Sequence, residues 1–245
     1  MNNREVQSKE ENAKEKVPKK KKSSPITIKA NKKGRHIMVF MNILRVIVIP
    51  FYYIIKPFRF YGKRKVADGA CVYISNHYAL FDPVYAASTT WEGIHFVGKK
   101  EIERMFLIGA VAKKAKAILV NRDGNDVRGV LDCLKCLKNG DKIAIYPEGT
   151  RNKGEGALLP FKHGAAALAI KAKVPIIPLC IYKKPKYFRC THILMGEPIE
   201  LTEYYDRKLS EEEVVGVDEM LRSKMLEMKA EHKAYLENKK KGKKS

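Results

Sequence analysis

The chain has 245 residues, of which 49 are lysine or arginine and 27 are acidic, and its formal net charge is +22. This length suits one domain with appended segments, and a hydrophobic content of 45% is enough for a packed core. The five cysteines are scattered and odd in number, which argues against a disulfide-built extracellular domain and for a reducing compartment.

Residues 1–35 are polar and rich in lysine and glutamate, so we expect a disordered basic arm. This stretch lacks the apolar core that a secretory signal needs. Its run Lys19–Lys22 and the lysine-rich tail at 239–245 suit anionic lipid headgroups or nucleic acid equally well on charge alone.

Residues 36–64 contain the most apolar segment of the chain, from Ile37 to Ile55. Its length is near that of a membrane span, but Arg45 lies near its middle and Pro50 interrupts it. Basic residues flank it on both sides, whereas a simple span has a one-sided excess. We therefore expect an amphipathic helix in the headgroup region of the cytoplasmic leaflet, continued by the aromatic and basic stretch 51–61. A membrane span and a buried core helix are the alternatives.

From residue 65 to 205, short apolar runs alternate with helical stretches, which predicts an α/β domain with a mixed, largely parallel sheet flanked by helices. Strands are predicted at 71–75, 94–98, 117–121, 142–146, 176–182 and 192–195. Helices are predicted at 83–91, 101–114, 126–138 and 162–172.

Residues 206–238 are expected to form a C-terminal helix that serves as a packing element. Ser210 and Glu213 have the spacing of a capping box, which marks its start. Within the domain, Cys133 and Cys136 form a Cys-x-x-Cys on an amphipathic helix. Because no second cysteine or histidine pair follows at finger-like spacing, this motif does not indicate a zinc site.

The first polar loop follows the apolar run that starts at Cys71. It contains His77, and Asp82 directly precedes Pro83, which is typical of a helix start. On one continuous helix, two side chains five residues apart would point about 140° away from each other, so only a loop lets Asp82 fold back onto His77. The carboxylate would then hold one imidazole nitrogen protonated and leave the other as a general base. The plain alternative is an ordinary loop histidine beside a helix cap.

A second polar turn, Glu148-Gly149-Thr150-Arg151, follows the predicted strand at 142–146. Glycine permits close backbone approach to a ligand, and an arginine fork suits phosphate oxygens. The plain alternative is a structural turn with a Glu–Arg ion pair.

Lys100 and Arg122 follow two further predicted strands. Because strand ends at one edge of a sheet converge, these cations indicate a site for a phosphorylated substrate facing His77 and Arg151.

Four blocks, in order, carry a family resemblance. They are Asn76-His77-x4-Asp82, Arg122 after an apolar strand, Tyr146-Pro-Glu-Gly-Thr-Arg151, and Val174-Pro175-Ile-Ile-Pro178. Over roughly residues 65–200 the chain resembles the glycerolipid acyltransferase family, and most of all its 1-acylglycerol-3-phosphate acyltransferase members.

The resemblance implies transfer of a fatty acyl group from an acyl-carrier-protein or coenzyme A thioester to lysophosphatidic acid, giving phosphatidic acid, with no metal and no further cofactor. It implies a general base at His77 oriented by Asp82. The substrate-binding residues that it implies are Lys100, Arg122, Glu148, Gly149, Thr150, Arg151 and Pro175, the last near the acyl site. Asn121 departs from the family pattern and leaves acceptor specificity open.

The resemblance also implies a place at the cytoplasmic face of the cell membrane, in contact with anionic lipid. A sister enzyme that acts on glycerol 3-phosphate or another lysophospholipid is the first alternative. A basic nucleic-acid-binding protein is a remote one, because the lysines cluster at the ends and no stacking pattern interrupts the α/β part.

Overall fold

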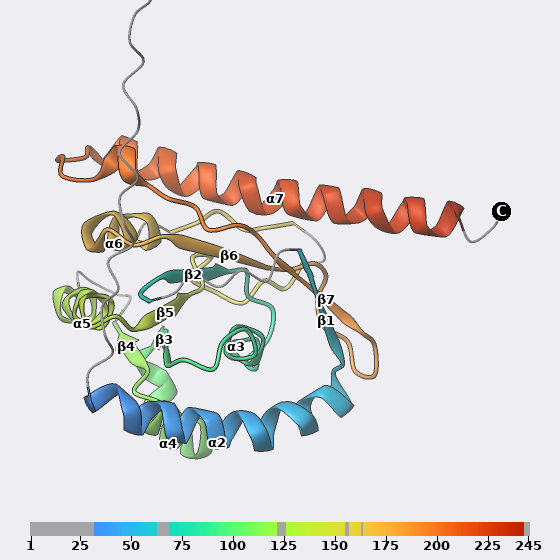
Figure 1. The fold of residues 1–245 in the computed structure, drawn as a ribbon, viewed down its shortest axis with the longest axis horizontal. Helices are drawn as coiled ribbons and strands as arrows, with labels where there is room; N and C mark the ends of the chain where they lie inside the picture. The colour runs from blue at the N-terminus through green and yellow to red at the C-terminus, as the bar shows by residue number, and fades with distance from the viewer. Residues whose placement is uncertain (1–31, 63–68, 122–125, 155–156, 163, 243–245) are drawn as a thin grey trace, which may run out of the picture.

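The computed structural model describes residues 32–62, 69–121, 126–154, 157–162 and 164–242. Its centre is a seven-stranded sheet in the order β1-β7-β6-β2-β5-β3-β4 (Figure 1). The strands are β1 Phe58–Gly62, β2 Val72–Ser75, β3 Ile94–Lys99, β4 Ile118–Val120, β5 Lys142–Ile145, β6 Ile176–Ile181 and β7 Thr191–Met195.

Five neighbouring strands, β6, β2, β5, β3 and β4, run parallel to one another. β7 runs antiparallel to β6, and β1 pairs parallel with β7. The mixed, largely parallel α/β sheet is therefore confirmed. Because β2, β5, β3 and β4 share one direction, the polar segments that follow them emerge at the same edge of the sheet.

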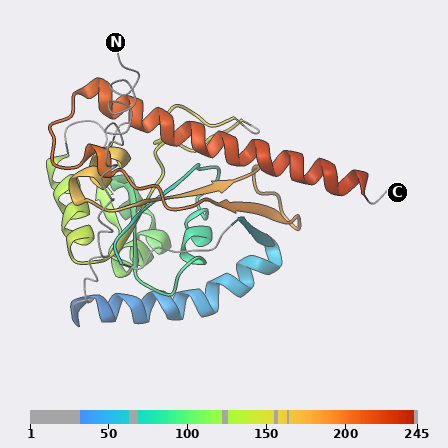
Figure 2. The ribbon, with the colours of Figure 1, turned by 45° about the horizontal axis from the view of Figure 1, so that its top comes forward.

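Helices cover both faces of this sheet. In Figures 1 and 2, α7 runs above it and α2 below it. The α-helices are α2 Lys32–Ile55, α3 Pro83–Ala87, α4 Phe106–Lys114, α5 Val127–Lys138, α6 Ala165–Ala172 and α7 Glu211–Lys241. Two short 3-10 helices, η1 Lys100–Arg104 and η2 Thr202–Tyr204, complete the elements.

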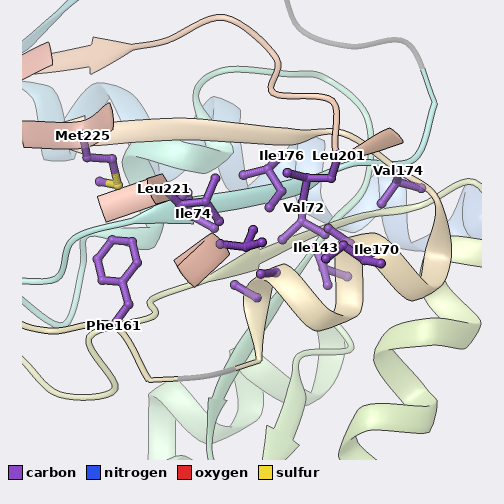
Figure 3. Close-up of a cluster of buried hydrophobic side chains, with 14 of the residues drawn as sticks. Val72, Ile74, Ile143, Phe161, Ile170, Val174, Ile176, Leu201, Leu221 and Met225 are labelled. Carbon is purple, nitrogen blue, oxygen red and sulfur yellow. The ribbon is translucent and has the colours of Figure 1, made fainter. Parts of the chain in front are cut away.

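Alternation along the central strands divides the core into two layers. Val72 and Ile74 of β2 pack with residues of α5, α6 and α7 on one face (Figure 3). Cys71 and Tyr73 point to the other face, where they meet residues of α2 and α3. β2 is thus buried on both sides, as the strands of a covered parallel sheet are.

The predicted helix boundaries agree only in part. The ends predicted at 114, 138 and 172 match those of α4, α5 and α6, and the start predicted at 83 matches that of α3, but α6 begins at Ala165, three residues after its predicted start. Ser210 caps α7 through the expected capping box with Glu213, but the helix runs on to Lys241, past the predicted end at 238. α3 stops at Ala87, short of the predicted 91. The predicted helix at 101–114 divides at Met105 into η1 and α4.

One strand escaped prediction. Phe58–Gly62 overlaps the end of the stretch 51–61 that we expected to continue the amphipathic helix, yet it forms β1 at the edge of the sheet. Its register places Phe58 opposite Thr191 and Gly62 opposite Met195 on β7. The pairing partner lies more than a hundred residues away in the chain, so no local pattern indicates it.

The amphipathic helix begins at Lys32, inside the stretch 1–35 predicted as a basic arm. Arg45, which the sequence analysis read as a charge unsuited to a membrane span, is 5% exposed and points into the protein. Its guanidinium donates to the main-chain carbonyls of Ala87 at 2.8 Å, Trp91 at 3.1 Å and Glu92 at 2.8 Å. Arg45 therefore fastens α2 to the end of α3 and to the segment that follows it.

The opposite side of α2 is apolar and exposed. These side chains are Val39, Ile43, Val46, Ile47, Phe51, Tyr53, Ile54 and Ile55. Within the described ranges, no helix combines the length and the hydropathy that crossing a membrane requires.

We predict that Arg45→Ala lowers the free energy of unfolding by about 2–4 kcal/mol. The substitution leaves three main-chain carbonyls without the buried charged donor that they now bind. Urea denaturation followed by circular dichroism measures this change. Arg59→Ala, at an exposed position on β1, is the matched control and should change stability by less than about 0.5 kcal/mol. Equal effects of the two substitutions would contradict this role of Arg45.

Candidate active site

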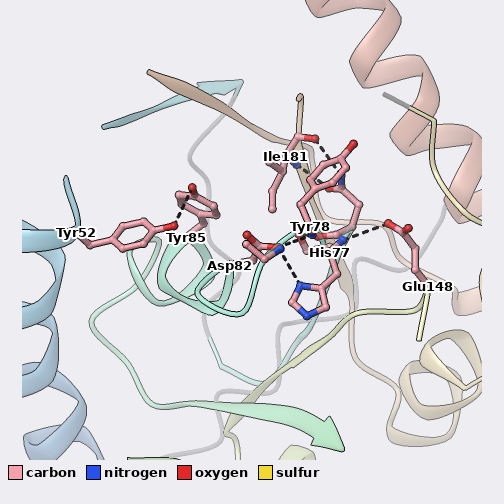
Figure 4. A network of polar contacts seen from close by, with 10 residues as sticks. Tyr52, His77, Tyr78, Asp82, Tyr85, Glu148 and Ile181 are labelled. Atoms are coloured by element: carbon pink, nitrogen blue, oxygen red, sulfur yellow. Dashed lines mark hydrogen bonds and ion pairs between the residues drawn. The ribbon is translucent and has the colours of Figure 1, made fainter. Parts of the chain in front are cut away.

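His77 and Asp82 lie in the loop between β2 and α3, as the sequence analysis expected. Asp82 folds back, and its Oδ2 lies 2.9 Å from His77 Nδ1 (Figure 4). Asp82 occupies the N-cap position of α3 and Pro83 follows at the first helical position, but the carboxylate makes no capping hydrogen bond. The plain alternative, in which Asp82 is only a helix cap, therefore does not describe this carboxylate.

The Asp82 side chain is fully buried. Its Oδ2 also accepts hydrogen bonds from the amides of Tyr78 at 2.6 Å and Ala79 at 2.7 Å. Oδ1 is buried without a hydrogen bond to the described residues, so the compensation for the buried charge comes through Oδ2. Short bonds from several donors to one oxygen are typical of an ionised carboxylate.

An ionised Asp82 fixes the state of the imidazole. His77 Nδ1 carries the proton and donates it to the carboxylate, which leaves Nε2 as the basic nitrogen. Nε2 points away from Asp82 (Figure 4), and the His77 side chain is 19% exposed. The pair thus presents one unprotonated nitrogen toward the outside of the loop.

The turn after β5 supports this loop from the neighbouring strand. Glu148 is 2% exposed, and its Oε1 accepts the His77 amide at 3.2 Å. Its Oε2 accepts the Leu159 amide at 3.3 Å. Burial raises the pKa of the Glu148 carboxyl above its ordinary value, although these amide bonds oppose the shift. The ring of Tyr146 lies 4.4 Å from the His77 ring, centre to centre.

Asn76 fixes the loop from the other neighbouring strand. It is fully buried, and its side-chain amide donates to the Ile181 carbonyl at 3.0 Å. Its Oδ1 accepts the Ile181 amide at 2.7 Å. His77 is therefore held between Asn76 on the β6 side and Glu148 on the β5 side.

Comparison with known proteins identifies the family of the chain. The sequence profile of a family described as Acyltransferase matches residues 57–182, slightly more than half of the chain. The chain belongs to this acyltransferase family.

Several relatives of this acyltransferase are named 1-acyl-sn-glycerol-3-phosphate acyltransferase. The Escherichia coli protein is 36% identical over 118 residues, which cover 46% of this chain and 47% of that protein. The Salmonella typhimurium protein is 32% identical over 157 residues, 58% of this chain and 63% of that protein. The chloroplastic Brassica napus protein BAT2 is 35% identical over 119 residues, 47% of this chain and 33% of that protein. The chain thus spans less than two thirds of the length of each of these relatives.

The fold also has a solved counterpart. The crystal structure of the 1-acyl-sn-glycerophosphate (LPA) acyltransferase PlsC from Thermotoga maritima matches with a TM-score of 0.56 and 21% identity. The match covers 79% of this chain and 78% of that chain. At this identity the match concerns the fold alone.

The other predicted site residues of the acyltransferase have different placements. Thr150 and Arg151 are exposed at the tip of the turn after β5. Gly149 has a φ of +65°, and a Cβ there would lie 2.7 Å from Cδ of Lys162. Only glycine suits this position without strain. Lys162 could not be predicted from the sequence, because nothing local links it to the turn.

Lys100 is exposed at the end of β3, two strands from β2 in the sheet order. The end of β3 therefore lies about 10 Å across the sheet from that of β2. Arg122 lies outside the described residues, directly after β4.

The fold does not place Pro175 near His77. Its carbonyl accepts the amide of Val72 at 3.0 Å, so it lies at the amino end of β6 and β2. His77 follows the carboxyl end of β2. The length of β6, roughly 20 Å for its six residues, separates the two. Pro175 therefore lies apart from the reacting groups at His77.

We predict that Asn76→Ala destabilises the fold by about 2–3 kcal/mol, since it leaves the buried amide and carbonyl of Ile181 without their partners. The midpoint of urea unfolding reports the change. Asn139→Ala, at the exposed end of α5, is the control and should leave the midpoint nearly unchanged. An unchanged midpoint for Asn76→Ala would show that these two hydrogen bonds do not hold the loop.

Proposed function

We propose that this acyltransferase moves a fatty acyl group from an acyl thioester to the free hydroxyl of lysophosphatidic acid, giving phosphatidic acid. The observation that carries the proposal is the bond between His77 Nδ1 and the buried Asp82 carboxylate, in a chain of this family. The names of the relatives support the choice of acceptor.

In the proposed reaction, Nε2 of His77 takes the proton of the acceptor hydroxyl as its oxygen attacks the thioester carbonyl. The carbon–oxygen bond forms, the carbon–sulfur bond breaks, and the imidazolium returns the proton to the departing thiolate. Asp82 stabilises the imidazolium while it exists, because the carboxylate already lies against Nδ1. General-base catalysis of this kind contributes about 10²–10⁴-fold.

The acceptor phosphate needs cations near the histidine. Arg151 is exposed, and the amide of the next residue, Asn152, donates to the His77 carbonyl at 2.6 Å. Lys162 is exposed and its side chain lies against Gly149, and Lys100 is exposed farther along the same edge of the sheet. We assign the phosphate chiefly to Arg151, with its bidentate fork, and propose Lys100 and Arg122 as further contacts. Thr150 and Gly149 would shape this end of the site. Glu148, whose carboxylate faces main-chain amides, would act by holding the loop.

The donor is an acyl-carrier-protein or coenzyme A thioester, and no other cofactor is part of the proposal. The apolar side of α2 would lie on the cytoplasmic face of a membrane that contains anionic lipid, which is where a lysophospholipid is found. α4 extends this surface: Phe106 is 91% exposed and Leu107 is 73% exposed. The Lys114 ammonium of α4 lies 5.9 Å from the centre of the Phe40 ring of α2, so the two helices are neighbours.

We expect His77→Ala to lower acyl transfer by at least about 10²-fold, because the substitution removes the base. Membranes carrying the protein would receive lysophosphatidic acid or glycerol 3-phosphate, each with an acyl thioester, and the lipid product would be quantified. His192→Ala is the matched control, because His192 lies on β7 and its ring bonds to His232 of α7.

Histidine-dependent formation of phosphatidic acid from lysophosphatidic acid alone supports the full proposal. Activity on glycerol 3-phosphate or another lysophospholipid instead would keep the mechanism and change the acceptor. Near-normal turnover by His77→Ala would overturn the assignment of the base.

For the membrane surface, we predict that Val46→Glu with Ile47→Glu weakens binding to phosphatidylglycerol-containing vesicles by at least about tenfold, because it puts charge where apolar side chains enter lipid. Vesicle sedimentation measures the bound fraction. Val130→Glu with Leu131→Glu, an exposed adjacent pair on α5, is the matched control and should bind normally.

The same assay, repeated at high salt, separates lipid insertion from charge. Binding that persists at high salt supports insertion of α2. Binding that vanishes with salt, together with salt-sensitive binding of nucleic acid, would favour the basic nucleic-acid-binding alternative.

A further inference from the structure

A second cluster of reactive side chains lies at the opposite edge of the sheet from His77. It consists of His95 near the start of β3, Cys136 on α5, and Asp141 directly before β5. One ligand atom from each, a ring nitrogen, a thiol sulfur and a carboxylate oxygen, lies within 4.8 Å of the other two. Because β5 has four residues, about 13 Å of strand separates this cluster from the edge with His77.

The imidazole of His95 is set for ligation. The residue is 4% exposed, and its Nδ1 lies 2.9 Å from the carbonyl oxygen of Lys116. A carbonyl only accepts, so Nδ1 carries a proton, and the ring presents the lone pair of Nε2 whenever Nε2 is unprotonated. This arrangement, in which one ring nitrogen donates to a carbonyl and fixes the other, is the usual one for histidines that bind metals.

Nε2 of His95 is buried and has no hydrogen-bond partner among the described residues. It lies 3.6 Å from Oδ2 of Asp141, which is too far for a hydrogen bond. In the neutral ring, a lone pair thus faces a carboxylate oxygen across a short gap, with the Cys136 sulfur beside them. Such a gap is electrostatically complementary to a cation.

The three ligands are held by local structure. The amide of Asp141 donates to the Cys136 carbonyl at 3.1 Å, which fixes the turn between α5 and β5. The β3–β5 register places His95 opposite Ile143, two residues beyond Asp141. The ligands therefore come from separate elements but share one backbone framework.

We propose that His95, Cys136 and Asp141 form a binding site for a divalent cation of the zinc class. Nitrogen, sulfur and oxygen ligands together are those that Zn²⁺ accepts. With bonds of about 2.0–2.3 Å, tetrahedral ligands lie roughly 3.5 Å apart, so the side chains would close by about 1 Å. The Asp141 side chain is 24% exposed, which leaves a route for the ion and for water as fourth ligand.

Because the site lies far from His77, we assign it a structural role. The ion would tie β3, α5 and the turn before β5 together without touching the acyl-transfer loop. The sequence gives no sign of this site, because its three ligands come from separate elements and do not form a second pair beside Cys133 and Cys136. Cys133 is instead packed in the hydrophobic core, whereas Cys136 lies beside His95 and Asp141, so the two cysteines do not act as a pair.

Cobalt binding tests the proposal independently of enzyme activity. The full chain would be stripped with a chelator, kept reduced and titrated with Co²⁺, which reports thiolate ligation by a charge-transfer band and tetrahedral geometry by visible absorption. We expect saturation at one equivalent and displacement by Zn²⁺. Zn²⁺ should also raise the midpoint of thermal unfolding.

Three variants locate the ion. Cys136→Ser should abolish the charge-transfer band. Asp141→Asn keeps the thiol and should weaken Co²⁺ binding by at least about 100-fold, because loss of even an outer-shell partner costs about 10–100-fold. Cys190→Ser removes an exposed cysteine elsewhere and should bind Co²⁺ normally.

Three outcomes would overturn the proposal: no charge-transfer band in the unmodified chain, a band that persists in Cys136→Ser, or a band lost in Cys190→Ser. The first would mean that His95 is protonated and forms an ordinary ion pair with Asp141. Circular dichroism of each variant separates loss of the ion from loss of the fold.

Discussion

A buried carboxylate with its charge compensated at one oxygen is the constraint around which the loop after β2 is built. A charge removed from water is costly unless several donors converge on it. Asp82 has two main-chain amides and one imidazole on Oδ2, and these three bonds dictate the path of residues 77–82. The same requirement explains why α3 begins without a side-chain cap: the acid that stands at the cap is used inside the loop.

The sequence predicts those parts of the fold that local patterns encode. β2, β5 and β6 are recognisable because strands covered on both faces are continuous apolar runs. The His77–Asp82 contact is predictable because only five residues separate the partners. β1 is not predictable in this way, because it forms by pairing with β7, which lies far along the chain. The brace from Glu148 to the His77 amide and the displacement of Pro175 to the far edge likewise depend on how distant strands align.

Arg45 predicts one orientation of the helix from the sequence and has the opposite orientation in the structure. In the sequence, a charge in the middle of an apolar segment suggests a helix that keeps its polar side toward water. In the structure the Arg45 guanidinium points into the protein and donates to main-chain carbonyls, whereas the outward side of the helix is apolar. The inward side also carries apolar residues, among them Met41, so the helix is apolar on both sides with one charge buried beneath it. Its firm attachment means that any surface it rests on also sets the orientation of the sheet.

The pairing of Asn76 with Ile181 extends the sheet beyond its last main-chain hydrogen bond. The side-chain amide offers one donor and one acceptor, as a peptide group does, so it stands in for the backbone of a strand residue while the real backbone turns away. Because a side-chain amide takes the place of a peptide group here, the fold is sensitive to loss of one nitrogen atom, that of the Asn76 side chain. Deamidation would replace the donor nitrogen with oxygen, place it against the Ile181 carbonyl, and introduce an uncompensated charge at a fully buried position. How long the loop keeps this structure therefore depends on how well the sheet protects the Asn76 side-chain amide from hydrolysis.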